Sequence, residues 1–557
     1  MQNKKAQIGL WAGFVHLVVC SMSMVHLVSA KPLMTLQELQ SKPKGVVRDF
    51  YVWDFINSKE TSLAESIQAY KLVSREITKL KTALYDKGFH PEIPKSVACT
   101  KLSFKELKQK DVECITYGLR ISQIPMMDKA DVAFLKKKLA NNPKLLRTIE
   151  ILRSPKIANA MFASNAQTFA EIFNALSYQQ KLEIFASGIE PSAIKKLANE
   201  NKSAFNNVLQ KIILDSAFGH FKQAISAADI TSADANTLFL LGINEVLYGK
   251  TKDALKYFAR SKDATINPFF RDRAIFWQYL VSNNELYLHD LQTSTFIDIF
   301  SIYANQKLKT TPKFKIVSSF DINSKNESKE PPLDIKDPFA WQIQSDKIIS
   351  IKNTELYEKS IRPFYHSDTV PHLAFFSNRL TKYSVNYYIM PYVDLMQWRD
   401  DTQKAMSLAI AKQESGFLPA LVSRSYALGM MQIMPFNVEP FAKKLGLSTI
   451  RLDSMFDPAL AYRFGTMFLD ELNAEFKHPL FVAYAYNGGP GALRRTLEKK
   501  RLFLKNRNYE PWLSLELIPS EETRFYGMKV LANYIIYQQL LGNDIEIETL
   551  LKQTLRY

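Results

Sequence analysis

One carboxylate in this chain stands where it could do acid chemistry. Residues 401–416 read DTQKAMSLAIAKQESG, an apolar, helix-like run that ends in Glu414. Met406, Ile410 and Glu414 are four residues apart, so they share one face of a helix. Gly416 is a typical helix stop. A carboxyl that emerges from a buried stripe is poorly solvated, which raises its pKa and suits a general acid. The alternative is an exposed or capping glutamate, which is common near helix ends.

A methionine-rich segment follows this acid closely. Residues 423–435 read SRSYALGMMQIMP. Methionine side chains are flexible and apolar, so Met430, Met431 and Met434 are suited to line an irregular binding surface. The competing interpretation is ordinary core packing, which we favour for Met430 and Met431.

Two further motifs lie downstream. Residues 485–491 read AYNGGPG, and their glycines and proline, together with Asn487, are expected to form a tight turn that lets the backbone approach a ligand. Residues 518–526 read IPSEETRFY. Tyr486 fits the core as well as a site. Glu522 fits an ion pair within its own motif as well as a site.

No second carboxylate accompanies Glu414 in its own motif. Asp400 and Asp401 precede it by roughly three to four helical turns, and Glu439 follows a proline-marked turn. Glycosidases ordinarily use two carboxylates, one as acid and one as nucleophile or base. A single acid suffices only if the substrate supplies the second group.

These motifs, in this order, resemble the catalytic domain of the soluble lytic transglycosylases, the exported lysozyme-like enzymes of bacterial cell walls. The resemblance covers roughly residues 386–545. The chain departs from the family pattern at Gly488, where alanine is usual, and at Tyr426, where a smaller residue is common and where the tyrosine is expected to narrow the cleft. An exported N-terminal region of stacked helices is also similar to the ring-like superhelical arm of that family.

The resemblance implies roles for the matching residues. Glu414 corresponds to the catalytic acid, Ser423 to a serine that contacts the N-acetyl group or the reacting oxygens, and Tyr486 to a tyrosine close to the acid. It also places four further residues at the substrate. Gln432 and Met434 line the glycan cleft, Asn487 lies in the turn, and Glu522 is a nearby acid.

The resemblance also implies a reaction, cleavage of the β-1,4 bond between N-acetylmuramic acid and N-acetylglucosamine in peptidoglycan without water. The N-acetyl oxygen would stabilise the developing cation and the 6-hydroxyl would attack, so that a 1,6-anhydro sugar forms, with Glu414 as acid and then base. No cofactor or metal is expected, because no Cys/His cluster has zinc spacing. The alternatives are a hydrolase of the same fold and a wall-binding scaffold that recruits other murein synthases or hydrolases. The sequence leaves open whether cleavage is internal or terminal, and whether stem peptides are required.

The elements that must position these residues are helices. The chain has 557 residues but only 18 glycines, and Lys, Leu, Ala and Ile are common, which favours helix over sheet. From about residue 130 to 300, apolar residues recur at three- and four-residue spacing. Residues 238–263 resemble one helical hairpin of a tetratricopeptide-type repeat, without a convincing second copy. We therefore expect a mainly α protein, with an N-terminal superhelix of stacked helical hairpins followed by a lysozyme-like, α-rich catalytic domain.

We expect four segments along the chain. Residues 1–30 have a basic start, an apolar run and a cleavage site after Ala30, which is typical of a secretory signal peptide. An uncleaved membrane anchor is the alternative. Residues 31–317 are expected to form the arm, 318–385 a linker with connecting helices, and 386–557 the catalytic domain. No transmembrane segment is expected after signal cleavage, and the location expected is the periplasm, with peripheral wall or membrane association.

Charge and cysteines restrict the partners. The net charge of +17 falls to +15 when Lys4 and Lys5 leave with the signal peptide. In an exported protein this charge favours anionic wall polymer or lipid headgroups over nucleic acid, so the expected partners are peptidoglycan strands. A generally lysine-rich surface is the alternative. Cys99 and Cys114 remain in the mature chain, where one disulfide is expected, with two free thiols as the alternative.

Overall fold

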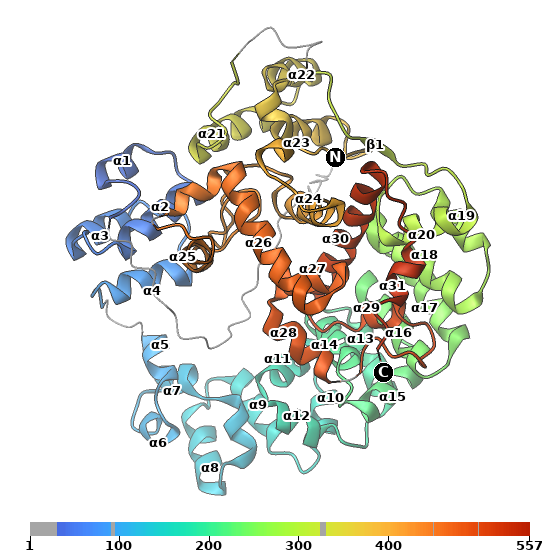
Figure 1. Ribbon diagram of the computed structural model, residues 1–557. Helices are drawn as coiled ribbons and strands as arrows, with labels where there is room; N and C mark the ends of the chain where they lie inside the picture. Colours follow the sequence, from blue (N-terminus) through green and yellow to red (C-terminus); the bar gives the residue numbers. More distant parts are fainter. Residues whose placement is uncertain (1–30, 91–94, 323–329, 449, 500, 557) are drawn as a thin grey trace. The chain divides into compact units, whose positions relative to one another are not determined.

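The computed structural model describes residues 31–90, 95–322, 330–448, 450–499 and 501–556. Figure 1 shows them with their helices and strands labelled. The predicted signal peptide, residues 1–30, lies outside the described residues, and so does the part of the predicted linker at residues 323–329.

The chain divides into two compact units. Unit 1 consists of the described residues up to Phe89, Thr295–Ile302 and Lys313–Tyr557, whereas unit 2 consists of His90–Ser294 and Tyr303–Pro312. The first helices of the chain therefore share a unit with the C-terminal domain. The predicted domain boundaries after residues 317 and 385 stay predictions.

Regular structure in the described residues is almost entirely helical, which confirms the predicted mainly α class. Unit 1 contains, before and after unit 2, α1 (Leu36–Ser41), α2 (Val46–Asn57), α3 (Leu63–Tyr70), α4 (Thr78–Asp86), β1 (Lys315–Val317), α21 (Pro338–Ile349), α22 (Thr354–Ile361), η2 (Arg362–Phe364), η3 (Ser367–Thr369), α23 (Val370–Leu380), β2 (Val385–Tyr387), η4 (Val393–Leu395), α24 (Asp401–Ser415), α25 (Pro435–Lys444), η5 (Leu452–Phe456), α26 (Pro458–Phe476), α27 (Pro479–Gly488), α28 (Pro490–Glu498), α29 (Trp512–Glu516), α30 (Glu521–Leu540) and α31 (Ile547–Lys552).

Unit 2 contains α5 (Lys95–Thr100), α6 (Phe104–Leu107), α7 (Val112–Gly118), η1 (Ile121–Met126), α8 (Lys129–Lys138), α9 (Pro143–Leu152), α10 (Ile157–Phe162), α11 (Ala166–Ala175), α12 (Tyr178–Ile184), α13 (Pro191–Asn199), α14 (Ser203–Leu214), α15 (Gly219–Ala227), α16 (Ala235–Leu247), α17 (Thr251–Asp263), α18 (Pro268–Ser282) and α19 (Leu286–Gln292). A further helix, α20 (Ile299–Leu308), begins in unit 1 and ends in unit 2. Within the parts of the chain that the structure describes, we find no helix with both the length and the apolar character needed to cross a membrane.

Unit 2 is a series of helices in which neighbours along the chain pack against each other. Helix α16 packs on α17, α17 on α18, and α18 on α19. The earlier helices share a core of phenylalanine rings, namely Phe162, Phe169, Phe173, Phe185, Phe205 and Phe221. The apolar spacing between about residues 130 and 300 thus corresponds to helices, and the predicted stacking is confirmed.

The segment that resembles a repeat hairpin, residues 238–263, lies in α16 and α17. Gly242 on α16 allows the close approach of Phe258 on α17, because a Cβ atom at Gly242 would lie 2.5 Å from the Phe258 ring. Trp277 on α18 packs against the same ring, with 5.6 Å between centroids. The glycine and phenylalanine of the repeat-like pattern therefore form the contact between the two helices.

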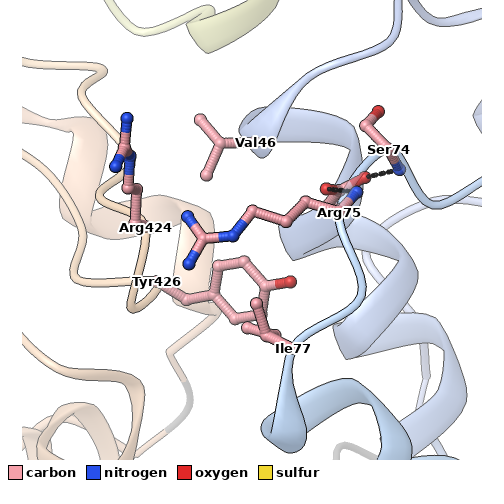
Figure 2. Close-up of a pocket in the computed structure, with 7 residues that line it drawn as sticks. Val46, Ser74, Arg75, Ile77, Arg424 and Tyr426 are labelled. Carbon is pink, nitrogen blue, oxygen red and sulfur yellow. Dashed lines mark hydrogen bonds between the residues drawn. The ribbon is translucent and has the colours of Figure 1, made fainter. Parts of the chain in front are cut away.

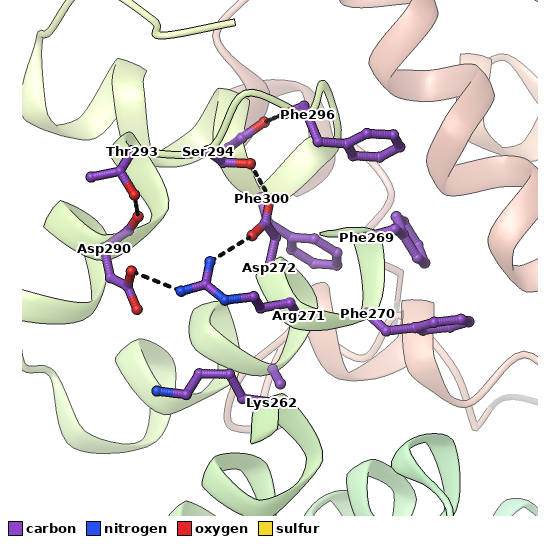
Figure 3. Close-up of polar contacts among 12 residues, drawn as sticks. Lys262, Phe269, Phe270, Arg271, Asp272, Asp290, Thr293, Ser294, Phe296 and Phe300 are labelled. Carbon is purple, nitrogen blue, oxygen red and sulfur yellow. Dashed lines mark hydrogen bonds and ion pairs between the residues drawn. The ribbon is translucent and has the colours of Figure 1, made fainter. Parts of the chain in front are cut away.

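A polar cluster joins α18 to the segment around α19 (Figure 3). Asp272 is buried and accepts a hydrogen bond from the Ser294 hydroxyl. Arg271 pairs with Asp290 on α19 at 3.2 Å. Burial raises the pKa of Asp272 to about 6. The hydroxyl group of Ser294 compensates part of the cost of burying this carboxyl by hydrogen bonding to it.

Cys99 on α5 and Cys114 on α7 form a disulfide, with their Cα atoms 5.3 Å apart. Both cysteines are buried together with Leu107 of α6. Closing a loop of this length contributes about 3 kcal/mol in the chain-entropy model. The disulfide stabilises a region whose three helices have only 6, 4 and 7 residues.

In unit 1 two short parallel strands, β1 and β2, bracket the helices α21–α23 in the sequence. Lys315 of β1 stands opposite Val385 of β2. The hydrophobic core of α21–α23 includes Trp341 and reaches Leu418, just beyond α24. Leu333, in the described part of the predicted linker, is buried in the same core. This region is therefore packed against the domain that follows it.

Helices α24, α27 and α30 form the centre of the C-terminal domain. Helix α30 packs against both α24 and α27. Gly527 on α30 allows Tyr484 on α27 to approach so closely that an added Cβ atom would lie 2.1 Å from its ring. Tyr388, which precedes α24, donates from its hydroxyl to Asn533 Oδ1 on α30 over 2.9 Å. These contacts position the elements around α30.

We predict that Gly527→Ala destabilises the protein. The added methyl group would overlap the Tyr484 ring, and overpacking of this kind costs about 1–3 kcal/mol. Gly219→Ala is the matched control, because Gly219 is also helical but an added Cβ atom there would have nothing within 4 Å, and alanine is the better helix former. Thermal melts followed by circular dichroism should show a lower Tm for Gly527→Ala only. An unchanged Tm for that variant would contradict the close contact of α27 and α30.

Candidate active site

Glu414 lies at the C-terminal end of α24, as the apolar spacing predicts. The helix ends at Ser415, and Gly416 follows in the left-handed region with φ 63°. Ile410, one turn before Glu414, is fully buried. The Ser415 hydroxyl donates to the backbone carbonyl of Met430 over 2.7 Å. The end of α24 and the methionine-rich segment are therefore joined at the position of the acid.

The surroundings of Glu414 raise the pKa of its carboxyl to about 7. The largest cause is the loss of hydration of this partly buried side chain. The charge of Glu522 acts in the same direction, whereas the hydrogen bond from Tyr526 lowers the pKa. Glu414 is therefore largely protonated below neutral pH, which is the state that a general acid requires.

Tyr526 on α30 is the direct partner of Glu414. Its hydroxyl donates to Glu414 Oε1 over 2.6 Å. Burial and the nearby Glu414 charge raise the pKa of Tyr526, so the hydroxyl remains a donor at neutral pH. Within the motif at residues 518–526, the sequence predicted a site role for Glu522 but not for Tyr526. The signal was present, since the two residues are four apart and so share one face of α30.

Tyr486 on α27 is a second tyrosine whose electrostatics depend on the acid. Its hydroxyl donates to the backbone carbonyl of Met431 over 2.7 Å. Burial, and secondarily the charge of Glu414, raise its pKa. The ring packs against Phe468, with 5.6 Å between centroids. Tyr486 therefore belongs both to the core and to the surroundings of Glu414. From the sequence, these two positions were alternative predictions.

Asn487 connects α27 to α30 directly. Its side-chain oxygen accepts a hydrogen bond from the Thr523 hydroxyl over 2.9 Å. The predicted turn follows at once, because α27 ends at Gly488, Gly489 has φ 85°, and α28 begins at Pro490. Asn487, which is predicted to contact the substrate, therefore links α27 to α30 in the structure.

The three methionines divide between core and surface. Met430 and Met431 are fully buried, and Met431 packs so closely on Gly465 of α26 that an added Cβ atom would lie 2.4 Å from its methyl group. Met434, at the start of α25, is half-buried. Met430 and Met431 are therefore core residues, and Met434 has a surface that a ligand can reach.

Ser423 and Gln432 lie in the loop between α24 and α25. The Ser423 hydroxyl oxygen accepts a hydrogen bond from the backbone N–H of Ala427 over 2.9 Å. The Gln432 side-chain amide donates to the backbone carbonyls of Gly429 and Leu421 at 2.8 and 3.3 Å. Both side chains stabilise the loop, and neither forms a hydrogen bond with Glu414 in the described part of the chain.

The carboxylates considered for a two-acid mechanism have other partners. Asp400 caps the start of α24, where it accepts a backbone hydrogen bond of 2.7 Å, about 20 Å from Glu414 along the helix axis. Glu439 pairs with Lys443 at 2.7 Å within α25. Glu522 is the carboxylate whose charge acts on Glu414. Among the residues whose placement is described, no group of three or more His, Cys, Asp or Glu side chains could hold a metal ion.

Comparison with known proteins agrees with this geometry. Residues 391–508 match the Transglycosylase SLT domain family. They include Glu414, the methionine-rich segment and the motif at the end of α27. A soluble lytic murein transglycosylase of Salmonella typhimurium is 31% identical over 144 residues, which are 26% of this chain and 22% of that protein. A membrane-bound lytic murein transglycosylase C of Glaesserella parasuis is 26% identical over 319 residues, which are 52% of this chain and 81% of that protein.

Among solved structures, a soluble lytic transglycosylase of Escherichia coli is similar, with 17% identity and a TM-score of 0.45 over 91% of this chain and 83% of that one. The match to the Salmonella protein spans less than a quarter of that protein's length. Residues 391–508 are similar to transglycosylase SLT domains. The predicted resemblance to the soluble lytic murein transglycosylases is confirmed.

We predict a single alkaline limb in the pH dependence of kcat/KM. Since the pKa of Glu414 is about 7 and the protonated form is the reactive one, log(kcat/KM) should fall above about pH 7 with a slope of −1. Glu522→Gln removes a like charge and should move the limb to lower pH. Tyr526→Phe removes a bond to the ionised carboxylate and should move it to higher pH.

Glu439→Gln is the control for these pH profiles, because Glu439 is exposed and pairs with Lys443. Its profile should match that of the parent protein. A limb that stays in place in both Glu522→Gln and Tyr526→Phe would show that Glu414 does not produce it.

We also predict that Glu414→Gln raises Tm at pH 8 more than at pH 5. Folding raises the pKa of this carboxyl, so the folded state binds the proton more tightly and loses stability when Glu414 ionises. This loss is complete above the folded pKa of about 7 and mostly absent at pH 5. Differential scanning calorimetry at both pH values measures the difference. An equal effect at both pH values would mean that Glu414 carries no burial cost.

Proposed function

We propose that this chain cleaves the β-1,4 bond between N-acetylmuramic acid and N-acetylglucosamine in peptidoglycan without water and forms 1,6-anhydromuramoyl products. The observation that carries this proposal is the raised pKa of the Glu414 carboxyl and its contact with Tyr526. This carboxyl has a pKa of about 7 and a direct bond to Tyr526, and it lies within residues 391–508, which match the Transglycosylase SLT domain family.

The chemistry needs one protein acid. Glu414 donates its proton to the glycosidic oxygen, and the bond between that oxygen and C1 of the muramic acid residue breaks. The N-acetyl oxygen of the same sugar stabilises the positive charge at C1. The 6-hydroxyl then attacks C1 and gives its proton to Glu414, which regenerates the acid. All atoms are accounted for without a water molecule, a cofactor or a second protein carboxylate.

The neighbours of Glu414 tune the proton transfer. The Tyr526 hydroxyl stabilises the carboxylate that forms after the proton has left. Glu522 raises the affinity of Glu414 for the returning proton through its charge. The residues that we propose as substrate contacts are Ser423, Gln432, Met434, Tyr486, Asn487 and Glu522.

We further propose that the protein works in the periplasm on the peptidoglycan strands. The support is the signal-like sequence at residues 1–30 and the net charge of +17 in the full chain. An excess of positive charge favours contact with anionic wall polymer or lipid headgroups. Contacts with other murein synthases or hydrolases would be a separate property of the helical arm.

Product analysis tests the proposed reaction. Purified sacculi are digested with the mature protein and with Glu414→Gln, and the soluble products are identified by mass spectrometry. We expect 1,6-anhydro-muropeptides from the former, and a rate lower by about 10²–10⁴ for the variant, as for loss of a general acid. Reducing ends in place of anhydro ends would identify a hydrolase of the same fold.

Glu439→Gln serves as the matched control for loss of an acidic side chain, and it should retain full activity. Tm and circular dichroism of Glu414→Gln establish that the variant is folded. No products from the folded mature protein, together with retained binding to sacculi, would favour a wall-binding scaffold over an enzyme.

A further inference from the structure

A strongly basic surface lies on the C-terminal domain, on α28 and the connection that follows it. Residues 494–507 hold seven basic residues and one acidic residue, so these fourteen positions carry a net charge of +6. The full chain of 557 residues carries +17. Six of the seventeen excess positive charges are therefore concentrated in one short segment, which the proposed reaction does not use.

Helix α28 presents basic side chains to solvent. Leu493 and Leu497 are buried, whereas Arg495 and Lys499 are exposed. Arg495 and Lys499 are four residues apart, so they share one face of the helix, opposite to the leucines. Helix α28 packs against α27 (Figure 1). The face that carries Arg495 and Lys499 is therefore directed away from the core.

The connection after α28 is held against the same helix, α27. Phe503 is fully buried and packs on Phe481 of α27, with 5.0 Å between ring centroids. The Phe503 carbonyl accepts a hydrogen bond from the backbone N–H of Arg556 over 2.6 Å. Arg501 and Lys505, two positions before and after Phe503, are exposed. The fold thus fixes the backbone of this connection while two more basic side chains remain in solvent.

Three acidic residues near this segment act on other arginines. Glu475 on α26 binds Arg494 through two hydrogen bonds of 2.5 and 3.1 Å. The charge of Glu498 also acts on Arg494. Glu510 pairs with Arg507. Arg494 and Arg507 are therefore compensated and add little to the potential of the surface.

The remaining exposed cations are less well compensated. Among the residues that the structure describes, no acidic side chain forms an ion pair with Lys499, Arg501 or Lys505. These three residues and Arg495 form a surface that we call the basic face. Positive side chains without counter-charges produce a positive potential that attracts anions.

We propose that the basic face binds the phosphate headgroups of an anionic membrane surface. Lysine binds phosphate as a point charge, and arginine binds it through paired N–H donors. A cluster of about four to eight Lys and Arg residues is typical of segments that bind anionic lipids. The proposal rests on the periplasmic location proposed above, and it concerns where the enzyme works rather than the reaction at Glu414.

The open setting of the basic face fits a broad partner better than a small ligand. Figure 2 shows the contrasting case in unit 1, a pocket in which Arg75 and Arg424 lie beside the Tyr426 ring. A pocket encloses one small group and orients it by a few placed polar contacts. The basic face has long side chains on the outside of a helix and a loop, so a layer of many headgroups can meet several of its charges at once. Carboxylates of the wall polymer are the competing partner.

Sedimentation with vesicles tests the proposal without turnover. The full mature chain is mixed with sucrose-loaded vesicles of phosphatidylcholine alone, or of phosphatidylcholine and phosphatidylglycerol in equal amounts. We expect binding to the anionic vesicles only, and weaker binding as the salt concentration rises. Each basic residue that reaches an anionic surface contributes up to about fivefold. The combined variant R495Q, K499Q, R501Q and K505Q should therefore lower the partition coefficient by about 100-fold.

The matched control removes the same total charge from α8 in unit 2, outside the basic face, where four lysines are exposed. This control combines K129Q, K136Q, K137Q and K138Q, and it should bind the anionic vesicles as the parent does. No binding of the parent to anionic vesicles, or equal loss in both combined variants, would overturn the proposal. If the basic-face variant loses binding to purified sacculi but keeps binding to anionic vesicles, the partner is the wall polymer and the proposal is wrong.

Two measurements separate this proposal from the proposed reaction. Circular dichroism and Tm establish that the basic-face variant is folded. In the absence of membranes, this variant should release anhydro products from soluble glycan oligomers at the same rate as the parent. Absence of anhydro products from both proteins, with vesicle binding of the parent intact, would overturn the proposed reaction alone.

Discussion

The hydrogen bond between the Tyr526 hydroxyl and the Glu414 carboxylate is the interaction on which the site depends. It joins the end of α24 to α30, and it balances two effects that would otherwise hold the proton on Glu414 too tightly, namely loss of hydration and the charge of Glu522. The resulting pKa of about 7 lets one residue both give and take a proton near neutral pH. Gly527 lets α30 approach α27 closely, and Asn533 on α30 donates to the backbone carbonyl of Ala409 on α24.

A single acid at such a pKa fits a reaction in which the protein contributes one carboxyl group. Asp400 is used as a helix cap, and Glu522 acts on Glu414 through its charge. In the proposed reaction the protein supplies the proton, and the substrate supplies the groups that stabilise and attack the cation. The first helices of the chain add a further constraint, because α2 and α4 hold the loop that contains Ser423 through Tyr426. The position of that loop therefore depends on helices more than three hundred residues earlier, such as the one that carries Lys79, which lies 346 positions from Ser425.

Local patterns in the sequence were enough for the helical class, for the helix that ends at Gly416 and for the acid at its end. The reason is that helix periodicity and capping are properties of neighbouring residues. The hairpin at residues 238–263 could also be predicted, because its Gly242 and Phe258 belong to one local motif. The same holds for the core role of Met430 and Met431, which the apolar run around them favours. Glu414 could be singled out as the candidate acid because the three motifs occur together.

The sequence by itself therefore determined the class of fold, the candidate acid and the family that its domain resembles. The tertiary structure decided the partner of that acid, since Tyr526 lies 112 positions from Glu414 and nothing local joins them. It also decided that Asn487 contacts Thr523, that Gln432 stabilises its own loop, and that Tyr426 packs on α2. A pKa depends on burial and on charges that distant segments bring together. Spacing along a helix specifies which face of the helix a residue occupies, but only tertiary packing specifies which other segments contact that face.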